Sequence, residues 1–183
     1  AQPALVRALF GGYDPALGVA ALRLFKDDAW TTVLVDDRVP CAKGGGPELG
    51  RCRDASALWM PLLEKAFAKL YGSYSALVGG HVGETLRTLT GCAVLDYAFD
   101  HDVVAPRVKS GALFDELRAR AAAGRALMGC AISSAAGVEA RAAHGLLANH
   151  AYGLLGLHEL DLGKGKRARL VEIRNPWGHR SED

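Results

Sequence analysis

The sequence lacks the features that would place the protein in a membrane or in a secretory pathway. No apolar run in the 183-residue sequence approaches the roughly eighteen consecutive residues of a transmembrane helix. The first seven residues, Ala1 to Arg7, contain no long apolar core of the kind that a signal peptide needs. We therefore expect no transmembrane segment and a location in the cytoplasm.

An excess of charge of one sign is also missing. The chain has 22 lysines and arginines against 20 aspartates and glutamates, which gives a net charge of +2. This balance does not predict the basic surface on which nucleic-acid binding depends, so we expect no nucleic-acid partner. Half of the residues are hydrophobic, which is enough for a core in one ordinary domain or in two small ones.

The four cysteines do not show the spacing of a metal or redox site, because no two of them form a Cys-x-x-Cys pair. Cys41 and Cys52 could close a small loop in an oxidising compartment. Without a secretory signal, we expect free thiols in a reducing one. Cys92 and Cys130 lie in apolar runs, which is typical of buried, unreactive thiols.

The last thirty residues carry the pattern of a β-hairpin. Two apolar runs, Leu154–Leu157 and Leu170–Ile173, flank the polar turn Asp161–Lys166. A hairpin would bring His150, before the first run, and Asn175, after the second, to the same end of two neighbouring strands. This is how a thiol hydrolase orients its base: an amide oxygen accepts from one ring N–H, and the other ring nitrogen faces the nucleophile.

A purely structural interpretation competes with this one. A histidine next to an apolar strand is commonly an ordinary buried residue, and Asn-Pro, here Asn175-Pro176, is a common turn dipeptide. The occurrence of both elements, in order, on consecutive strands favours the hydrolase arrangement. The indole of Trp177, two residues after Asn175, is suited to shield the hydrogen bond between His150 and Asn175 from water.

The earlier part of the chain predicts a mixture of strands and helices. Val19–Phe25 and Trp30–Val35 are apolar runs around a polar turn and predict a hairpin. Leucines and alanines recur at helical spacing from Leu58 to Leu70, with Asp54 or Ser56 placed to cap that helix. We expect a loop over residues 1–18, helices over Glu84–Leu89 and from Ser110 to Gly124, and a buried strand over Ala126–Ile132.

Two further patterns invite a chemical interpretation. The glycine-rich stretch Lys43–Leu49 is not a phosphate-binding loop, because the closing Gly-Lys-Ser/Thr is missing. The adjacent carboxylates of Asp36 and Asp37 stand before Arg38 and could serve acid–base or metal chemistry. An ion-paired strand end is the simpler interpretation, since charged surface residues are usually solvated or paired.

Several of these stretches resemble the calpain family of papain-like cysteine endopeptidases. The family's catalytic histidine lies in Gly-His-Ala-Tyr and its asparagine in Arg-Asn-Pro-Trp-Gly; here Asn149–Tyr152 and Arg174–Gly178 match them. Trp59–Gly80 keeps nearly all of a long family motif, and Val33–Pro40 resembles Val-Asp-Asp-Arg-Leu-Pro. The departure is Asn149 in place of glycine, although Asn tolerates positive φ better than most residues.

The resemblance implies an α+β fold that is part of a papain-like cysteine protease core. Residues 1–79 would complete the nucleophile-bearing subdomain, and residues 80–183 would form the antiparallel, β-rich His/Asn subdomain, with the boundary at Gly79-Gly80. His150 would act as general base and then acid, Asn175 would orient it, and Trp177 would cover the pair.

The family's nucleophile lies in a Gly-Asp-Cys-Trp motif, with an oxyanion-stabilising glutamine before it. Neither motif is in this sequence. We therefore expect the chain to be a fragment of a longer polypeptide whose upstream, cysteine-bearing segment is its partner. The chain alone is predicted to hydrolyse nothing.

The resemblance also implies calcium as a cofactor, because a Gly-Glu-Leu motif supplies a carboxylate to a calcium ion in calpains. Glu48 falls at that place. The expected activity is calcium-dependent, limited proteolysis of protein substrates inside the cell. The alternative is a catalytically inactive calpain-like module for binding or scaffolding.

Overall fold

The computed structural model describes residues 3–52, 54, 56–135, 137 and 139–176. The chain is α+β with two small antiparallel sheets. It divides into two compact units, residues 1–94 (unit 1) and residues 95–183 (unit 2). The boundary expected at Gly79-Gly80 concerns the subdomains of a complete protease core and stays a prediction.

Unit 1 is built on a three-stranded antiparallel sheet in the order β1-β2-β3. The predicted hairpin is confirmed as β2 and β3, which pair along their whole length. The loop expected over residues 1–18 is wrong, because α1 and β1 lie there. Strand β1 forms by pairing with β2 around a bulge at Phe10/Gly12, so tertiary pairing overrides the low strand propensity of its glycines. The elements of unit 1 are α1 (Pro3–Leu9), β1 (Phe10–Asp14), β2 (Val19–Lys26), β3 (Ala29–Asp36), α2 (Trp59–Tyr71), the short 3₁₀ helix η1 (Tyr74–Leu77) and α3 (Val82–Thr90).

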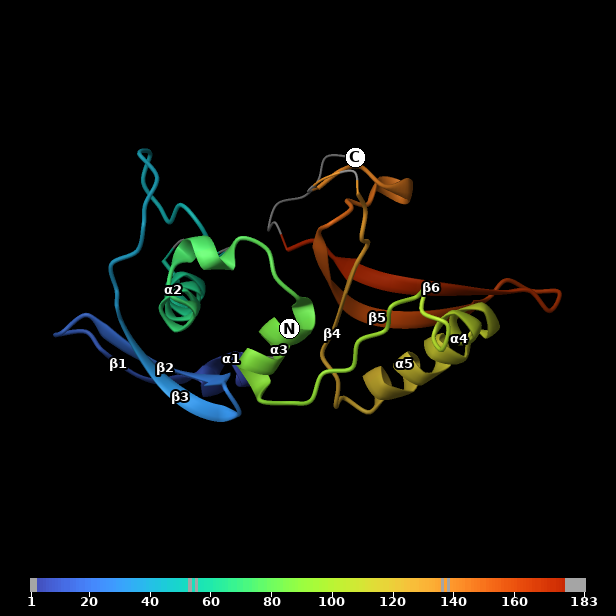
Figure 1. The fold of residues 1–183 in the computed structure, drawn as a ribbon, viewed down its shortest axis with the longest axis horizontal. Coiled ribbons are helices and arrows are strands. Elements are labelled where there is room, and N and C mark those ends of the chain that lie inside the picture. The colour runs from blue at the N-terminus through green and yellow to red at the C-terminus, as the bar shows by residue number, and fades with distance from the viewer. Residues whose placement is uncertain (1–2, 53, 55, 136, 138, 177–183) are drawn as a thin grey trace. The chain divides into compact units, whose positions relative to one another are not determined.

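Helix α2 covers one face of this sheet (Figure 1). Alternate residues of β2 are fully buried on that face, because side chains alternate between the two faces of a strand; Leu22 and Leu24 are the largest of them. Full burial of each leucine contributes about 1.5–3 kcal/mol. The sheet side chains pack with the apolar stripe of the helix. This core consists of Leu9, Ala20, Leu22, Leu24, Val33, Val35, Leu62, Leu63 and Ala66.

The start of α2 corrects a sequence prediction. Its N-cap residue is Leu58, which offers no side-chain cap. The Asp54 carboxylate instead accepts hydrogen bonds from the backbone N–H (2.9 Å) and the hydroxyl (2.7 Å) of Ser56. Both predicted caps therefore form a local turn before the helix, a conformation that Asp and Ser side chains commonly stabilise.

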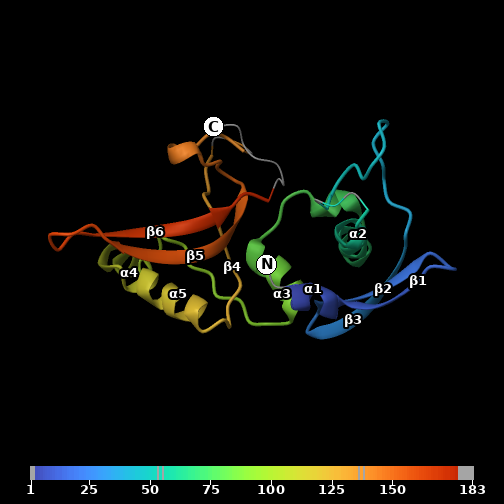
Figure 2. The same cartoon turned by 180° about the vertical axis from the view of Figure 1, so that it is seen from behind.

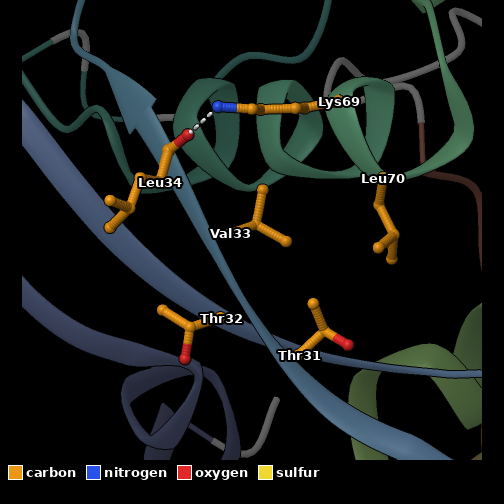
Figure 3. Close-up of a pocket in the computed structure, with 6 residues that line it drawn as sticks. All are labelled: Thr31, Thr32, Val33, Leu34, Lys69 and Leu70. Atoms are coloured by element: carbon orange, nitrogen blue, oxygen red, sulfur yellow. Dashed lines mark hydrogen bonds between the residues drawn. The ribbon is translucent and has the colours of Figure 1, made fainter.

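Lysines of α2 hold the outer strand β3. Lys69 Nζ donates to the carbonyl oxygen of Leu34 at 2.7 Å, beside a groove of about 390 Å³ lined also by Thr31, Thr32, Val33 and Leu70 (Figure 3). Lys65 Nζ lies 2.7 Å from the Asp36 carboxylate. That hydrogen bond lowers the pKa of Asp36, so the ion-paired interpretation of Asp36 is confirmed.

Unit 2 contains the second sheet, in the order β4-β5-β6. The hairpin predicted near the end of the chain is confirmed as β5 and β6, with a register shift between Leu154 and Gly156. The helix expected from Ser110 is shorter, because Ser110 ends α4 and Gly111 (φ 80°) separates it from α5. The elements of unit 2 are α4 (Ala105–Ser110), α5 (Ala112–Ala122), β4 (Met128–Ala131), the 3₁₀ turn η2 (Ala143–Gly145), β5 (Ala151–Asp161) and β6 (Arg167–Arg174).

Helix α5 lies against the β5–β6 hairpin (Figures 1 and 2) and is joined to it by charges. The Glu159 carboxylate, with only 14% of the side chain exposed, lies 2.7 Å from Arg167 Nη1. That hydrogen bond lowers the pKa of Glu159, and the nearby guanidinium groups of Arg118 and Arg169 lower it further. We call Asp115, Arg118, Glu159, Arg167 and Arg169 the Glu159 cluster.

All four cysteines are free thiols, as the sequence predicts. Cys92 is exposed, so the expectation that it is buried is wrong. Cys130 on β4 is half-buried, and burial raises the pKa of its thiol. Among the described residues, no helix is both long enough and apolar enough to cross a membrane.

Candidate active site

The hairpin of unit 2 brings His150 and Asn175 together. Strand β5 begins one residue after His150, and β6 ends one residue before Asn175. The antiparallel pairing of Gly153 with Arg174 places these flanking residues at the same end of the hairpin. The distance between His150 Nε2 and Asn175 Oδ1 is 2.9 Å.

The ring of His150 is held in place on several sides. Its side chain is only 9% exposed. The Tyr152 ring meets it edge-on, with centroids 4.9 Å apart and planes at 82°. The Tyr152 hydroxyl also accepts a hydrogen bond from the Leu147 backbone N–H at 2.8 Å, so Tyr152 links the ring to the chain that precedes it. With Oδ1 of Asn175 as the acceptor, Nε2 carries a proton and Nδ1 is the nitrogen left for chemistry.

Glu139 lies at that second nitrogen. Its Oε1 is 3.3 Å from His150 Nδ1, and its side chain is 44% exposed. This contact was not predicted from the sequence. No motif marks it, because the contact depends on the path of the connection between β4 and β5 and not on any periodic pattern.

The side chain of Asn149 holds the connection between β4 and β5 in place. Its backbone is in the left-handed region (φ 53°), as expected where relatives of the motif have glycine. Its side chain also forms three hydrogen bonds. Oδ1 accepts from the Ser134 N–H at 3.1 Å, while Nδ2 donates to the carbonyl oxygens of Ser134 and Gly137, each at 2.7 Å. The tolerance of Asn149 for positive φ was predicted from the sequence, and these three hydrogen bonds were not.

The other predicted site residues lie elsewhere. Trp177 falls outside the described residues. Glu48 belongs to unit 1, where it is exposed in the glycine-rich turn and its backbone N–H donates to the Pro40 carbonyl at 2.9 Å. Within the described part of the chain, no three His, Cys, Asp or Glu side chains are grouped to hold a metal ion. Calcium takes six to eight oxygen ligands, so the single carboxylate of Glu48 does not make a calcium site by itself.

A buried histidine held by an asparagine oxygen at the base of a hairpin is an arrangement that a thiol hydrolase could use to orient its base. Comparison with known proteins identifies the family. The family model for calpain family cysteine proteases matches residues 10–182. The chain belongs to the calpain family, a family of cysteine proteases.

Individual relatives support the assignment. Calpain-12 of Homo sapiens is 39% identical over 161 residues, which cover 88% of this chain and 21% of that protein. A calpain of Schistosoma mansoni is 34% identical over 91% of this chain and 21% of its own length. The calpain-type cysteine protease DEK1 of Arabidopsis thaliana is 34% identical over 90% of this chain and 7% of its own length. The chain thus spans about a fifth or less of these relatives.

Proposed function

We propose that this chain is the His/Asn-bearing part of a papain-like protease core in a calpain-type cysteine endopeptidase. The observation that carries the proposal is the 2.9 Å contact between His150 Nε2 and Asn175 Oδ1 at a buried ring. The nucleophilic cysteine would come from an upstream segment of the same, longer polypeptide. The substrates would be proteins, cut at a limited number of sites, and the expected location is the cytoplasm.

The chemistry assigned to this chain is proton transfer. His150 would take the proton of the cysteine thiol at Nδ1, and the thiolate would attack the scissile carbonyl carbon. The imidazolium would then give this proton to the leaving amine nitrogen as the carbon–nitrogen bond breaks. In the second half, His150 would take a proton from water, whose oxygen attacks the thioester, and return it to the departing thiol. Asn175 would keep Nδ1 aimed at the reacting atoms throughout, and Trp177 would shield the pair from water.

By itself, the chain is proposed to be inactive. A nucleophilic thiol is activated by a lowered pKa or by an adjacent base. Burial acts in the opposite direction on Cys130, because it raises the pKa of that thiol. Cys41 and Cys92 are exposed. Turnover by the isolated chain that disappears when one of its own cysteines is replaced would contradict this proposal.

Calcium dependence rests on the resemblance and on Glu48 alone. Calorimetric titration of the chain with calcium, repeated on Glu48→Gln, tests the residue directly. Heat of binding that is lost in Glu48→Gln supports a role for Glu48, and equal heats for both proteins contradict it.

The catalytic proposal is tested in the longer polypeptide that contains this chain. We expect His150→Ala to lower turnover of an unfolded protein substrate by about 10²- to 10⁴-fold, the usual contribution of a general base. His158→Ala is the matched control, because His158 is an exposed histidine of the same hairpin, paired with Glu172 at 3.1 Å. Equal activities of the wild type and His150→Ala would contradict the assignment.

A catalytically inactive, calpain-like binding module is the second candidate. One observation favours it: the Glu139 carboxylate lies at the ring nitrogen that a thiol would have to approach. Labelling the longer polypeptide with a thiol-directed affinity reagent separates the two candidates. Labelling of one upstream cysteine that is lost in His150→Ala indicates a protease. A longer polypeptide without such a cysteine indicates a binding module.

A further inference from the structure

We propose that Asn149 is a positioning residue for His150, because its side-chain amide continues the pairing of β4 with β5 beyond the point where their backbones pair. This inference rests on the proposed function, since it concerns how the same base is aimed. Asn149 would act through the main chain that leads into His150 and not on the reacting atoms themselves.

The ladder of backbone bonds between β4 and β5 ends next to the base. Its last regular pair is Ala131 with Ala151, the residue that follows His150. One further bond runs from the Asn149 N–H to the Ile132 carbonyl at 2.7 Å. Asn149 itself has a left-handed backbone, with φ 53°, which lies outside the β region and ends the extended strand. Regular backbone pairing therefore stops at the residue before the base.

The Asn149 side chain takes the place of the next pair. A primary amide has a carbonyl acceptor and N–H donors on one planar group, much as a peptide unit has an acceptor and a donor. Oδ1 accepts from the Ser134 N–H at 3.1 Å, and Nδ2 donates to the Ser134 carbonyl at 2.7 Å. Nδ2 also donates to the Gly137 carbonyl at 2.7 Å. We call these three side-chain bonds the Asn149 clamp, because they fix two points of the β4–β5 connection to the residue before the base.

The Asn149 clamp acts on His150 through the main chain. His150 follows Asn149 directly, so the direction in which the chain enters β5 depends on how Asn149 is held. From this entry, His150 Nε2 reaches Asn175 Oδ1 at 2.9 Å, and the Tyr152 ring lies edge-on to the His150 ring, with centroids 4.9 Å apart. A misplacement of about 1 Å can lower the rate of a catalysed reaction by about 10²-fold. Loss of the clamp is therefore expected to reduce the fraction of molecules in which the base is correctly aimed.

Two replacements of Asn149 separate the clamp from the shape of the turn. Asn149→Gly keeps the backbone conformation, because glycine adopts positive φ without strain, and removes all three side-chain bonds. Asn149→Asp keeps the shape of the side chain, but an ionised carboxylate has no donor and would face the carbonyl oxygens of Ser134 and Gly137. If the amide acts as a peptide unit does, activity falls in the order Asn, Gly, Asp. The replacement of equal shape then does more harm than removal of the side chain.

The first test uses NMR on the 183-residue chain and does not require proteolysis. We expect Asn149→Gly to speed hydrogen exchange of the Ser134 N–H by about three- to tenfold, the factor that one net hydrogen bond contributes. The ring-proton shifts of His150, which the edge-on Tyr152 ring perturbs, should move toward those of an unstructured histidine. Unchanged ring shifts overturn the inference even if exchange is faster, since the clamp would then hold the connection without aiming the base.

Lys164→Gly is the matched control for this test. Lys164 is another residue of unit 2 with a left-handed backbone (φ 54°), and it lies in the turn between β5 and β6. The replacement introduces the same conformational freedom of glycine away from the clamp. It should change neither the exchange of Ser134 nor the ring shifts of His150.

The second test measures kcat and KM of the longer polypeptide. Asn149→Gly should lower kcat by about three- to tenfold with KM unchanged, and Asn149→Asp should lower kcat further. When Asn149→Gly is added to His150→Ala, no further fall is expected, because both changes act on one base. Lys164→Gly should leave kcat and KM as they are in the wild type.

Three kinetic outcomes overturn the inference. A rise of KM at constant kcat in Asn149→Gly would mean that Asn149 serves substrate binding. An unchanged kcat and KM would mean that it has no part in turnover. A higher kcat in Asn149→Asp than in Asn149→Gly would mean that the amide does not act as a peptide unit. If the wild-type polypeptide cleaves no protein, the proposed function fails, while the NMR test still decides whether the clamp aims the ring.

Discussion

The two units of this chain are stabilised by different means. Unit 1 buries a continuous set of aliphatic side chains between its sheet and α2, with Leu22 and Leu24 fully enclosed. Among the described residues of unit 2, few apolar side chains are fully buried, and α5 is joined to its hairpin by the Glu159 cluster. The candidate active site belongs to this second unit, in which His150 is a buried polar residue.

The two kinds of contact have different structural effects. Apolar packing does not depend on the direction in which particular atoms point, whereas hydrogen bonds fix the orientation of the side chains that form them. A base that must present one particular nitrogen benefits from neighbours that determine the angle of its ring, as Asn175 and Tyr152 do. In the unit with the smaller apolar core, the orientation of His150 therefore depends on its polar and aromatic neighbours.

The largest expected effect comes from the core of unit 1. Leu24→Ala removes a fully buried side chain and leaves a cavity, so we expect a loss of about 2–5 kcal/mol in the free energy of unfolding of that unit. Urea denaturation followed by amide NMR signals of β2 and β3 measures it, and signals of β5 and β6 report on unit 2. Leu34→Ala, at an exposed position of the same sheet, should cost much less. Equal losses in both units would show that their stabilities are not separate.

A smaller effect is expected at the hairpin base. Asn175→Ala removes the acceptor that faces the buried Nε2 of His150, and the loss of such a partner costs about 1–3 kcal/mol. Urea denaturation followed by signals of β5 and β6 measures this loss. Signals of unit 1 should keep their midpoint. An unchanged midpoint for unit 2 would mean that the bond orients the ring without stabilising the unit.

The Glu159 cluster predicts a dependence on pH. Because Arg167, Arg118 and Arg169 lower the folded-state pKa of Glu159, its stabilising contribution is complete above the unfolded-state pKa of about 4.3. This contribution is lost as the pH falls through the lower, folded-state value. Glu159→Gln should therefore reduce the stability of unit 2 at neutral pH and flatten its decline in acid. Some decline remains, since Tyr97 and the neighbouring arginines also lower the pKa of Glu116. Thermal unfolding from pH 3 to pH 7 measures both effects.

The smallest effect is expected at the exposed pair of His158 and Glu172. Both side chains are more than half exposed, and such ion pairs contribute little because water screens them. Glu172→Gln should change the free energy of unfolding by less than about 0.5 kcal/mol. A larger loss, measured by the same urea titration, would indicate that even the surface charges of unit 2 contribute to its stability.

Local sequence patterns were sufficient for much of the fold. The hairpin of β5 and β6 was predictable because two apolar runs flank a polar, glycine-containing turn. The pairing of its strands then predicts that His150 and Asn175 meet, although their roles in catalysis stay predictions. Helix α2 was predictable from the 3.6-residue spacing of its apolar face.

Other features depend on partners that are distant in the sequence. Strand β1 exists because β2 offers a free edge, and its two glycines give no local indication of a strand. Glu139 approaches His150 only because Asn149 and backbone bonds fold the connection back. Ser110 is not the N-cap of α5, because it ends α4 and the left-handed Gly111 holds that position. Contacts of this kind require the three-dimensional path of the chain.

The bulge at Leu154/Gly156 divides the hairpin into two independently registered parts. On one side it sets the pairing of Gly153 with Arg174, which aligns the candidate active site; on the other it sets the pairing of Glu159 with Arg169. Leu155 is the residue of β5 that stands between two consecutive pairs of the ladder, so deleting it would remove the bulge and leave both alignments in place. A bulge bends its strand and increases the local twist. The extra residue therefore changes the direction of the hairpin between the candidate active site and the Glu159 cluster without changing which residues pair.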